Sequence, residues 1–475
     1  MQRLGPDEMS ISPQPSVADS FSSLVVDEGF ESDLSLKDGS RVAVVGGGPA
    51  GSFFAFFLLK MAEAVDLDLA VDIYEPRSFK HCGPAGCNHC GGIVSESLVQ
   101  ILATEGINLP PKVVQRGIES YVVHMDEGSV AIQSPSGEQR IAALYRGNGP
   151  RGGGDSPWDS FDGYLQRIAM DRGASVVRRL ITAVEWRDGR PWLLGADGEE
   201  EGYDLVAVAS GVNSNFLQLL EDLPAAVAPP KTTRTYICEF RSTPEEVYRV
   251  LGNAMHVFML TIPRLEFAAI IPKGEFATVV MLGDHLDQEL VHAFLNDPVV
   301  RHCFPTGATP CVCSCSPLIN MGPTKRPYGD RVVLIGDSGV TRLYKDGIGA
   351  AFRTAKAAAS TAILEGVSSE AFKEHYWPTC RGIARDNAIG KVIFGTTTLF
   401  KMSKISRRAI LRMAEREQAN PDATRHMSSL LWNMFTGSAP YKEILRGTLH
   451  PGFLANMALN LAAGVAPPSE SGKVA

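Results

Sequence analysis

Residues 41–64 read RVAVVGGGPAGSFFAFFLLKMAEA, and this stretch decides the fold. The run RVAVV is short, apolar and rich in β-branched residues, which predicts a buried parallel strand. A glycine-rich turn follows directly, and the apolar segment after it predicts a helix. In such a turn, Gly46 permits the sharp bend, Gly48 lets the backbone approach a pyrophosphate, and Gly51 lets the helix pack closely on the strand.

The next apolar run, LAVDIYE at 69–75, predicts a second strand. It ends in Glu75, which is placed to accept hydrogen bonds from a ribose diol. The free N–H groups and the dipole at the start of the helix favour a phosphate. Strand, turn, helix and acidic strand end together predict a nucleotide-binding βαβ unit.

The composition places these motifs in an ordinary large protein. The chain has 475 residues, of which 44% are hydrophobic and 21% charged, which predicts two closely packed domains plus extensions. Residues 1–40 hold eight acidic and two basic residues, and residues 1–38 are predicted to form a disordered acidic leader. With no apolar run of about 18 residues and no basic–aromatic module, we expect a cytoplasmic protein that does not bind nucleic acid.

A second motif lies near residue 337. The segment DRVVLIGDS at 330–338 predicts a strand that ends in Gly336-Asp337, and the Gly347-Ile348-Gly349 turn then precedes an apolar helix. This arrangement resembles the second FAD motif of the p-hydroxybenzoate hydroxylase and geranylgeranyl reductase superfamily. The resemblance implies that FAD is the cofactor and that Asp337 binds a ribityl hydroxyl. It also implies that the glycine turn and the helix start face the pyrimidine side of the flavin, where they would stabilise negative charge.

The middle of the chain resembles the same superfamily. FDGYL at 161–165 predicts the start of a helix, SVVRRLITAVEW at 175–186 a strand, and DLVAVASGVNS at 204–214 a strand that ends in Ser210-Gly211. In the superfamily, this last turn passes near the flavin pyrophosphate. Many members have Asp-Gly where this chain has Ser210-Gly211, so the resemblance gives little support for NADPH docking.

These motifs together predict an α/β fold with a discontinuous, three-layer, Rossmann-like FAD-binding domain. Its predicted segments are 39–112, 158–222 and 320–379. The alternating patterns elsewhere predict an inserted antiparallel-sheet substrate domain over 113–157 and 223–319. A helical C-terminal extension is predicted over 380–475.

Two segments bear on the reaction. Cys90-Gly91-Gly92, and FAAIIPKG at 267–274 followed by VVMLG at 279–283, resemble segments of geranylgeranyl reductases. The resemblance implies hydride transfer from reduced flavin to a C=C bond of a small apolar, isoprenoid-like substrate, with NADPH or reduced ferredoxin as electron donor. Phe267 and Ala269 replace the family's aromatic pair. They also replace both tryptophans of the halogenase Trp-x-Trp-x-Ile-Pro pattern.

A flavin-dependent monooxygenase or halogenase is the enzymatic alternative. An electron-transfer flavoprotein that engages a redox partner is the alternative from another class.

The chain has nine cysteines, and six of them fall in two clusters. In HCGPAGCNHCGG at 81–92, the spacing of Cys82, Cys87 and Cys90 matches that of plant-type ferredoxins. Cys313 and Cys315, in the second cluster, could supply a fourth ligand. Three interpretations stay open: small packing residues of a glycine-rich loop, a redox or pocket role of Cys90 beside the flavin, or a metal or iron–sulfur cluster.

The candidate site has two parts. Cys90, His89 and Tyr344 are the candidate proton donors. The predicted FAD contacts are Gly46, Gly48, Ala50, Gly51, Glu75, Arg77, Gly91, Gly92, Gly211, Gly336, Asp337, Gly347, Ile348 and Gly349.

A basic stretch follows in the C-terminal extension. Lys401, Lys404, Arg407, Arg408 and Arg412 interleave with Leu399, Met402, Ile405, Ala409 and Met413 at helical spacing. Such a helix can pack its apolar stripe on the FAD domain and expose its basic face, or it can lie on an anionic membrane surface. The first interpretation is the prediction, and a peripheral membrane contact is the alternative.

Overall fold

The computed structural model describes residues 34–79, 90–134, 141–150, 159–220, 228–420, 422 and 424–463, with only the backbone of 311–313. The predicted acidic leader lies outside this part of the chain except for residues 34–38. There Leu36 is buried, and the Leu34 carbonyl accepts a hydrogen bond from the Val367 N–H at 2.6 Å. The described chain therefore joins the core from its first residues.

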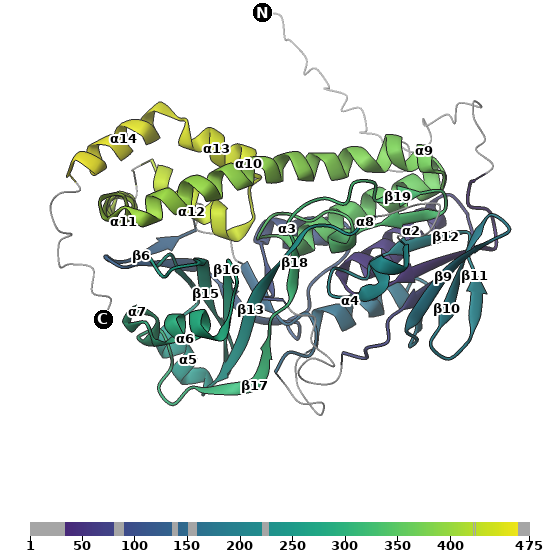
Figure 1. Cartoon of the computed structure of the whole chain (residues 1–475), viewed down its shortest axis with the longest axis horizontal. Coiled ribbons are helices and arrows are strands. Elements are labelled where there is room, and N and C mark those ends of the chain that lie inside the picture. Colours follow the sequence, from purple (N-terminus) through teal and green to yellow (C-terminus); the bar gives the residue numbers. More distant parts are fainter. Residues whose placement is uncertain are drawn as a thin grey trace, which may run out of the picture.

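A six-stranded sheet forms the half of the molecule that the sequence predicts to bind a nucleotide, at the right of Figure 1; we call it the nucleotide-binding half. Its order is β19 (Tyr328–Gly329), β20 (Val332–Leu334), β12 (Leu205–Val208), β1 (Ser40–Val45), β2 (Leu69–Tyr74) and β8 (Ser175–Val177). All pairs are parallel except β19–β20. The strand predicted from RVAVV is therefore central, as its continuous apolar run requires.

Two layers cover this sheet. On one face lie α2 (Pro49–Ala64), α4 (Phe161–Met170) and α8 (Gly347–Leu364), whose apolar sides share a core with the inward residues of β1 and β12. On the other face lies a three-stranded sheet of β9 (Ile181–Arg187), β10 (Arg190–Gly195) and β11 (Glu200–Gly202). The three-layer prediction is confirmed.

One predicted strand was wrong in detail. The stretch 175–186 is not continuous: β8 ends at Val177, and β9 belongs to the other sheet. The residues between them turn, with the Arg179 N–H bonded to the Val177 carbonyl at 2.9 Å. The side chain of Arg178 meanwhile reaches back to the Glu75 and Arg77 carbonyls. These contacts carry the chain from one layer to the next.

A second large sheet occupies the lower left of Figure 1. Its order is β17 (Thr309–Cys315), β13 (Thr232–Arg241), β16 (Phe276–Gly283), β15 (Leu265–Lys273), β14 (Ala254–Phe258), β5 (Ser120–Met125) and β6 (Gly128–Gln133), with β18 (Leu318–Asn320) also paired to β13. The expected antiparallel pattern holds except between β14 and β5, which are parallel. These two strands come from separate segments of the chain, so no hairpin sets their direction.

Short helices and a small sheet complete this half. Helices α5 (Pro244–Leu251), α6 (Gln288–Asn296) and α7 (Pro298–Arg301) cover one face of the second sheet. The three-stranded sheet of β3 (Ile93–Val94), β7 (Ile141–Leu144) and β4 (Val114–Ile118), together with α3 (Glu96–Thr104), lies next to α2. Three short helical segments are η2 (Asn215–Leu220), η3 (Gly336–Ser338) and α9 (Ser369–Ala371).

The C-terminal helices run across the top of the molecule in Figure 1. After a π-turn, η4 (Phe372–Tyr376), come α10 (Trp377–Met402), α11 (Lys404–Ala419), α12 (His426–Thr436), α13 (Tyr441–Thr448) and α14 (Pro451–Ala462). Their apolar sides share a core with β5, β6 and β14 of the second sheet. Among the described residues, no helix is both long and apolar enough to cross a membrane.

The basic stretch does not form the predicted helix with a solvated basic face. It is divided at Ser403 between α10 and α11. Lys401 is buried and donates to the carbonyls of Leu265 and Glu266, and Arg407 is buried against Glu127 at 2.5 and 2.6 Å. The ion pair and the carbonyl bonds compensate the burial of these two bases, a long-range effect that helical spacing does not reveal.

Candidate active site

A cavity of about 870 Å³ lies where the nucleotide-binding half, the second sheet and the C-terminal helices meet. This volume falls within the roughly 300–1,000 Å³ of ligand and cofactor sites. One end is lined by the glycine-rich turns of the first sheet, and the other by apolar side chains of the second sheet and the C-terminal helices.

The turn between β1 and α2 shows why its glycines are needed. Gly46 has φ +110°, and a side chain there would meet the Ala209 carbonyl oxygen at 2.5 Å. A Cβ at Gly51 would lie 2.0 Å from the Gly46 carbonyl oxygen. Helix α2 begins after Gly48, which offers no side-chain cap, and Pro49 occupies its first turn. The helix N-terminus therefore faces the cavity with its dipole uncompensated by any acidic residue of its own first turn.

The second and middle motifs contact the first one. Gly336 has φ +58°, and a Cβ there would lie 2.7 Å from the Cβ of Ala50. The Gly211 N–H donates to the Ser338 hydroxyl at 2.9 Å. Three segments that are far apart in the sequence therefore converge at one end of the cavity.

Glu75 lies at the end of β2 and lines the same cavity. Its carboxylate accepts hydrogen bonds from the Gly47 N–H at 3.1 Å and from the Arg77 backbone and side chain at 3.0 and 3.1 Å. Gln166 of α4 donates to the Gly47 carbonyl at 2.8 Å. Glu75 thus holds the glycine-rich turn in place, and part of its side chain lines the cavity.

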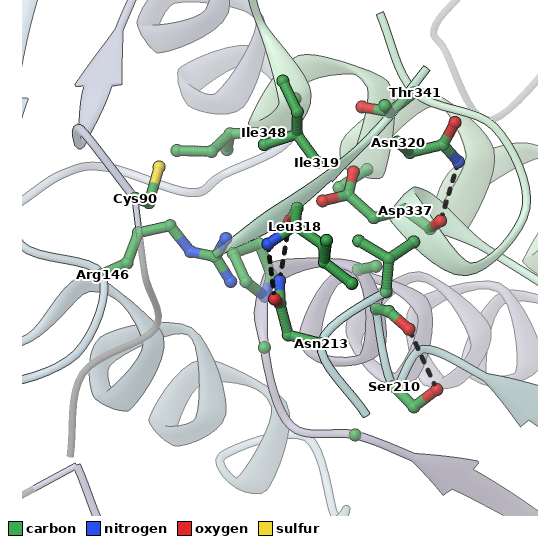
Figure 2. Close-up of a pocket in the computed structure, with 18 of the residues that line it drawn as sticks. Cys90, Arg146, Ser210, Asn213, Leu318, Ile319, Asn320, Asp337, Thr341 and Ile348 are labelled. Carbon is green, nitrogen blue, oxygen red and sulfur yellow. Dashed lines mark hydrogen bonds between the residues drawn. The ribbon is translucent and has the colours of Figure 1, made fainter. Parts of the chain in front are cut away.

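Figure 2 shows the middle of the cavity, with Arg146, Cys90 and Asp337 around a common space. The Arg146 guanidinium pairs with the carboxylate of Asp162 at 3.1 Å. Burial raises the pKa of Asp337, and the nearby Arg146 cation opposes that rise. Arg146 was not among the predicted residues, since no local motif marks it.

Two asparagines also position this part of the site. Asn213 exchanges two hydrogen bonds with the backbone of Leu318, at 2.9 and 2.8 Å, and Asn320 donates to the Asp337 carbonyl at 2.9 Å (Figure 2). They join the nucleotide-binding half to β18 of the second sheet. These two asparagines were not predicted, because their partners lie 105 and 17 residues away in the sequence and no local motif includes both members of a pair.

The Gly91-Gly92 loop is constrained by close contacts. Gly92 has φ +68°, and a Cβ there would lie 1.9 Å from the Leu144 carbonyl oxygen. A Cβ at Gly91 would approach Val280 at 3.1 Å. The Gly92 N–H donates a hydrogen bond to the Cys90 Sγ at 3.3 Å. Cys90 itself lines the cavity.

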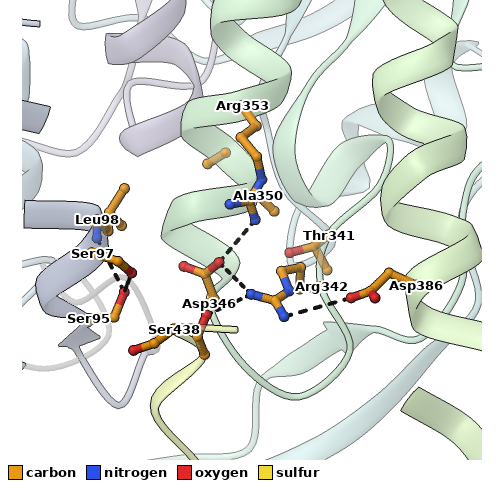
Figure 3. A network of polar contacts seen from close by, with 12 residues as sticks. Ser95, Ser97, Leu98, Thr341, Arg342, Asp346, Ala350, Arg353, Asp386 and Ser438 are labelled. Carbon is orange, nitrogen blue, oxygen red and sulfur yellow. Dashed lines mark hydrogen bonds and ion pairs between the residues drawn. The ribbon is translucent and has the colours of Figure 1, made fainter. Parts of the chain in front are cut away.

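The loop before α8 is held by the C-terminal helices (Figure 3). Arg342 pairs with Asp346 at 3.0 Å and donates to the Gly437 and Ala439 carbonyls at 2.7 Å each. Arg353 contacts the same Asp346 oxygen at 3.0 Å. The Asp346 carboxylate explains why residue 349 is a glycine, because a Cβ at this position would lie 2.1 Å from the Asp346 Oδ1.

Two residues of this loop adopt backbone conformations that ordinary residues seldom adopt. Tyr344 has φ +60° and Asp346 φ +52°. Lys345 lies between them, its ammonium bonded to the Asn433 carbonyl at 2.6 Å and 4.4 Å from the Tyr441 ring centre. Burial, and secondarily Arg342, lowers the pKa of Lys345 well below its usual value. Backbone strain of this kind costs about 1–3 kcal/mol per residue and is commonly found at functional sites.

The far end of the cavity is apolar and aromatic. Phe267 lines it together with Tyr344 of the α8 loop and Phe435 of α12. The Phe267 ring lies 6.0 to 6.2 Å from the rings of Phe435, Tyr344 and Phe394, and Phe394 lies 4.8 Å from Tyr344. The aromatic neighbours of Phe267 therefore come from the α8 loop and the C-terminal helices.

Most predicted site residues line this cavity. Those that do are Gly46, Gly48, Ala50, Glu75, Arg77, Cys90, Gly91, Gly92, Gly211, Asp337, Tyr344, Gly347 and Ile348. Gly51, Gly336 and Gly349 stand behind it, at the close contacts given above. His89 lies outside the described residues. The roles of all these residues stay predictions.

The predicted metal ligands are largely outside the described residues. Cys82 and Cys87 lie outside them, the side chain of Cys313 is not described, and Cys90 and Cys315 are both partly exposed. A different group comes together in the second sheet, where His124, His256 and Cys303 are all buried. The ring nitrogens of the two histidines lie 2.9 Å apart, and their rings are nearly parallel, with centres 5.1 Å apart. This near-linear arrangement is that of a direct N–H···N hydrogen bond.

Solved structures share this architecture at low sequence identity. A flavoprotein/dehydrogenase from Cytophaga hutchinsonii is 15% identical, with a TM-score of 0.60 over 90% of this chain and 100% of its own. The halogenase PltM in complex with phloroglucinol and FAD is 12% identical, with a TM-score of 0.57 over 90% and 91%. P. aeruginosa PqsL in complex with 2-aminobenzoylacetate is 14% identical, with a TM-score of 0.52 over 74% and 95%.

These comparisons establish the fold. The chain has the Rossmann-like fold of FAD-binding flavoproteins, with an additional sheet domain and C-terminal helices. No protein-family model matches the chain, and no curated protein matches it in sequence.

Proposed function

We propose that this chain is an FAD-dependent oxidoreductase that reduces C=C bonds of a small apolar, isoprenoid-like substrate. The observation that carries the proposal is the cavity itself, which joins three converging glycine motifs at one end to an aromatic chamber at the other. The likeness of the fold to proteins crystallised with FAD supports the cofactor.

The residues present fit FAD. The α2 N-terminus and the Gly46 turn would hold the pyrophosphate, and Glu75 a ribose diol. Asp337 faces the middle of the cavity, where a ribityl hydroxyl would add a hydrogen-bond partner. The α8 N-terminus would stabilise negative charge at the pyrimidine edge. When bound and reduced, the flavin supplies the hydride.

The chain must then supply a proton and exclude water. Burial raises the pKa of Tyr344, and the Glu266 charge adds to that rise. The phenol is therefore protonated at neutral pH and holds a proton at its Oη, while the raised pKa makes it a weaker acid than free tyrosine. Tyr344 lies where the cofactor end of the cavity meets the aromatic chamber, which makes it the candidate proton donor. Cys90 is the second candidate, on the opposite loop.

The chamber favours an apolar substrate. Met255, Ile271, Val280 and Leu282 of the second sheet line it beside Phe267. Each buried CH₂ contributes about 0.8 kcal/mol, so a prenyl chain gains more here than a polar molecule of equal size. NADPH or reduced ferredoxin is the expected electron donor.

A flavin-dependent monooxygenase or halogenase is the second candidate. The fold's likeness to the halogenase PltM favours it, whereas Phe267 and Ala269 in place of the halogenase tryptophans weigh against it. The third candidate is an electron-transfer flavoprotein, which would exchange electrons rapidly with a ferredoxin or quinone and turn over no small molecule.

One assay separates the three. Purified protein is reduced anaerobically with NADPH, ferredoxin or dithionite and mixed with prenyl lipids, and products are analysed by mass spectrometry. A reductase yields a product heavier by two hydrogens without oxygen. Substrate-dependent oxygen consumption in a parallel aerobic reaction, with no saturated product in the anaerobic one, would overturn the reductase proposal in favour of the second candidate.

The variant Tyr344→Phe tests the proton donor. We expect turnover to fall by about 10²–10⁴-fold, while flavin reduction by dithionite stays unchanged. Cys90→Ser is the matched comparison on the opposite loop. If Cys90→Ser loses turnover and Tyr344→Phe does not, the proton comes from the Cys90 side.

A further inference from the structure

Helix α10 carries an apolar stripe on its outer side. Val392, Leu399 and Met402 recur at helical spacing and are 60%, 73% and 66% exposed. Phe400, also in α10, is 40% exposed, and Ile405, beyond the break at Ser403 at the start of α11, is 47% exposed. We call these five residues the α10 stripe. Large apolar side chains gathered in this way commonly mark an interaction surface.

Along α10 and the start of α11, the charged residues near the α10 stripe are all basic. The acidic groups packed against them, Glu266 at Thr398 and Asp126 and Glu127 at Arg407, come from other elements. Residues 387–414 contain six basic residues and no acidic residue, in a chain whose net charge is -8. Lys401 and Arg407 are used internally, but Lys391 and Lys404 flank the stripe and are exposed. Exposed apolar side chains bordered by lysines match an anionic lipid surface, where the hydrocarbon enters the acyl boundary and the ammonium groups meet phosphates.

The inner side of α10 closes the substrate chamber. Phe394, Thr397 and Thr398 border a small cavity that also contacts Phe267 and Phe435, and the last two line the main cavity as well. One helix therefore separates the aromatic chamber from the α10 stripe.

We infer that the α10 stripe docks the protein on an anionic membrane surface. The contact is peripheral and sets α10 at the level of the acyl chains. A prenyl lipid would then pass beside α10 into the chamber without crossing water, a step that rests on the proposed function. The docking of the α10 stripe on the membrane does not depend on the proposed function.

The test uses the full chain with its flavin and sedimentation with vesicles. We expect binding to vesicles of equal parts phosphatidylcholine and phosphatidylglycerol, and weaker binding to phosphatidylcholine alone or at high salt. The double variant Leu399→Gln with Met402→Gln should bind on the order of 100-fold more weakly, since each side chain contributes about tenfold. Lys391→Glu with Lys404→Glu should lose the preference for the anionic lipid.

The matched control is Leu364→Gln, which removes a leucine that is 58% exposed from the end of α8. It should bind vesicles like the wild type. Flavin absorbance and a melting curve on each sample show that the variants are folded. Vesicle binding needs no turnover, so it is scored separately from the proposed reaction.

Three results would overturn the docking inference. The first is a wild-type protein that ignores anionic vesicles, and the second is a double variant that binds as the wild type does. The third is a wild-type dimer that the double variant converts to a monomer in sedimentation velocity, since the stripe would then bind a second copy.

Discussion

At the scale of single residues, the glycines of the first motif are explained by distances to backbone atoms. A Cβ at position 51 would overlap the Gly46 carbonyl oxygen. Because the overlapping atom belongs to the backbone and not to a flexible side chain, it cannot move aside. These positions were predictable because the fingerprint is local: six consecutive residues set the turn, and their chemistry is the same wherever the motif occurs.

Gly51→Ala should therefore displace α2 from β1. We expect the free energy of unfolding to fall by about 1–3 kcal/mol and bound FAD to be lost. Gly382→Ala in α10 is the control, because a Cβ there meets no atom within 4 Å. It should gain about 0.5–1 kcal/mol from helix propensity. Chemical unfolding and flavin content measure both, and equal behaviour of the two variants would refute the steric explanation.

The buried histidine pair predicts a pH dependence. Burial lowers the pKa of His124 to about 3 and that of His256 to about 4, both below the unfolded value of about 6.5. The unfolded chain therefore binds more protons as the pH falls below about 6.5. Stability is complete above that pH and decreases toward pH 4, by about 1.4 kcal/mol per pH unit for each histidine.

Replacing both histidines with glutamine should flatten this slope, whatever it does to stability at neutral pH. His375→Gln, at an exposed position, should leave the slope unchanged. Melting temperatures across pH 4–7 decide the matter, and a double variant with the wild-type slope would contradict the assignment.

At the scale of elements, the loop before α8 depends on partners far away in the sequence. The sequence predicted its glycines from their resemblance to an FAD motif, but not what holds the strained Tyr344 and Asp346. Those contacts come from the loop between α12 and α13, about 95 residues later, through Arg342. A pairwise contact at that separation leaves no pattern in a single sequence. For this reason neither Arg146 nor the contacts of Arg342 with Asp346, Gly437 and Ala439, which we call the Arg342 clamp, were predicted.

Arg342→Gln should therefore damage both stability and the cofactor site. The guanidinium is buried and its loss leaves two carbonyls unpaired, so we expect about 3 kcal/mol less stability and at least tenfold weaker FAD binding. Arg353→Gln shares the same carboxylate partner but is 40% exposed, and should change stability by less than about 1 kcal/mol. Similar effects of both variants would mean that the Arg342 clamp does not position the loop before α8.

At the scale of the whole molecule, the substrate chamber is assembled from parts that the sequence presents separately. The three glycine motifs gave the layered fold and one end of the cavity, because each motif is a short segment with its own pattern. The other end could not be predicted, since the rings that surround Phe267, those of Phe394 and Phe435, come from a distant part of the chain. The C-terminal helices are therefore part of the site.

Phe435→Ala should enlarge the chamber without disturbing the cofactor. We expect geranylgeraniol, followed by its effect on flavin absorbance, to bind at least about tenfold more weakly. FAD affinity should stay within about twofold, because Phe435 lies at the apolar end. Phe304→Ala removes a half-buried phenylalanine packed on Phe240, remote from the cavity, and serves as control. Loss of FAD rather than of the lipid would place Phe435 in the cofactor site instead.

The central claim is that the three converging motifs hold FAD. It is tested most directly by calorimetric titration of flavin-free protein with FAD, FMN and NADPH, with the released flavin identified by mass spectrometry. The structure predicts one FAD per chain, much weaker binding of FMN and NADPH, and loss of FAD binding in Gly51→Ala but not in Gly382→Ala. A folded wild-type chain that binds no FAD, or that binds FMN equally well, would contradict the account.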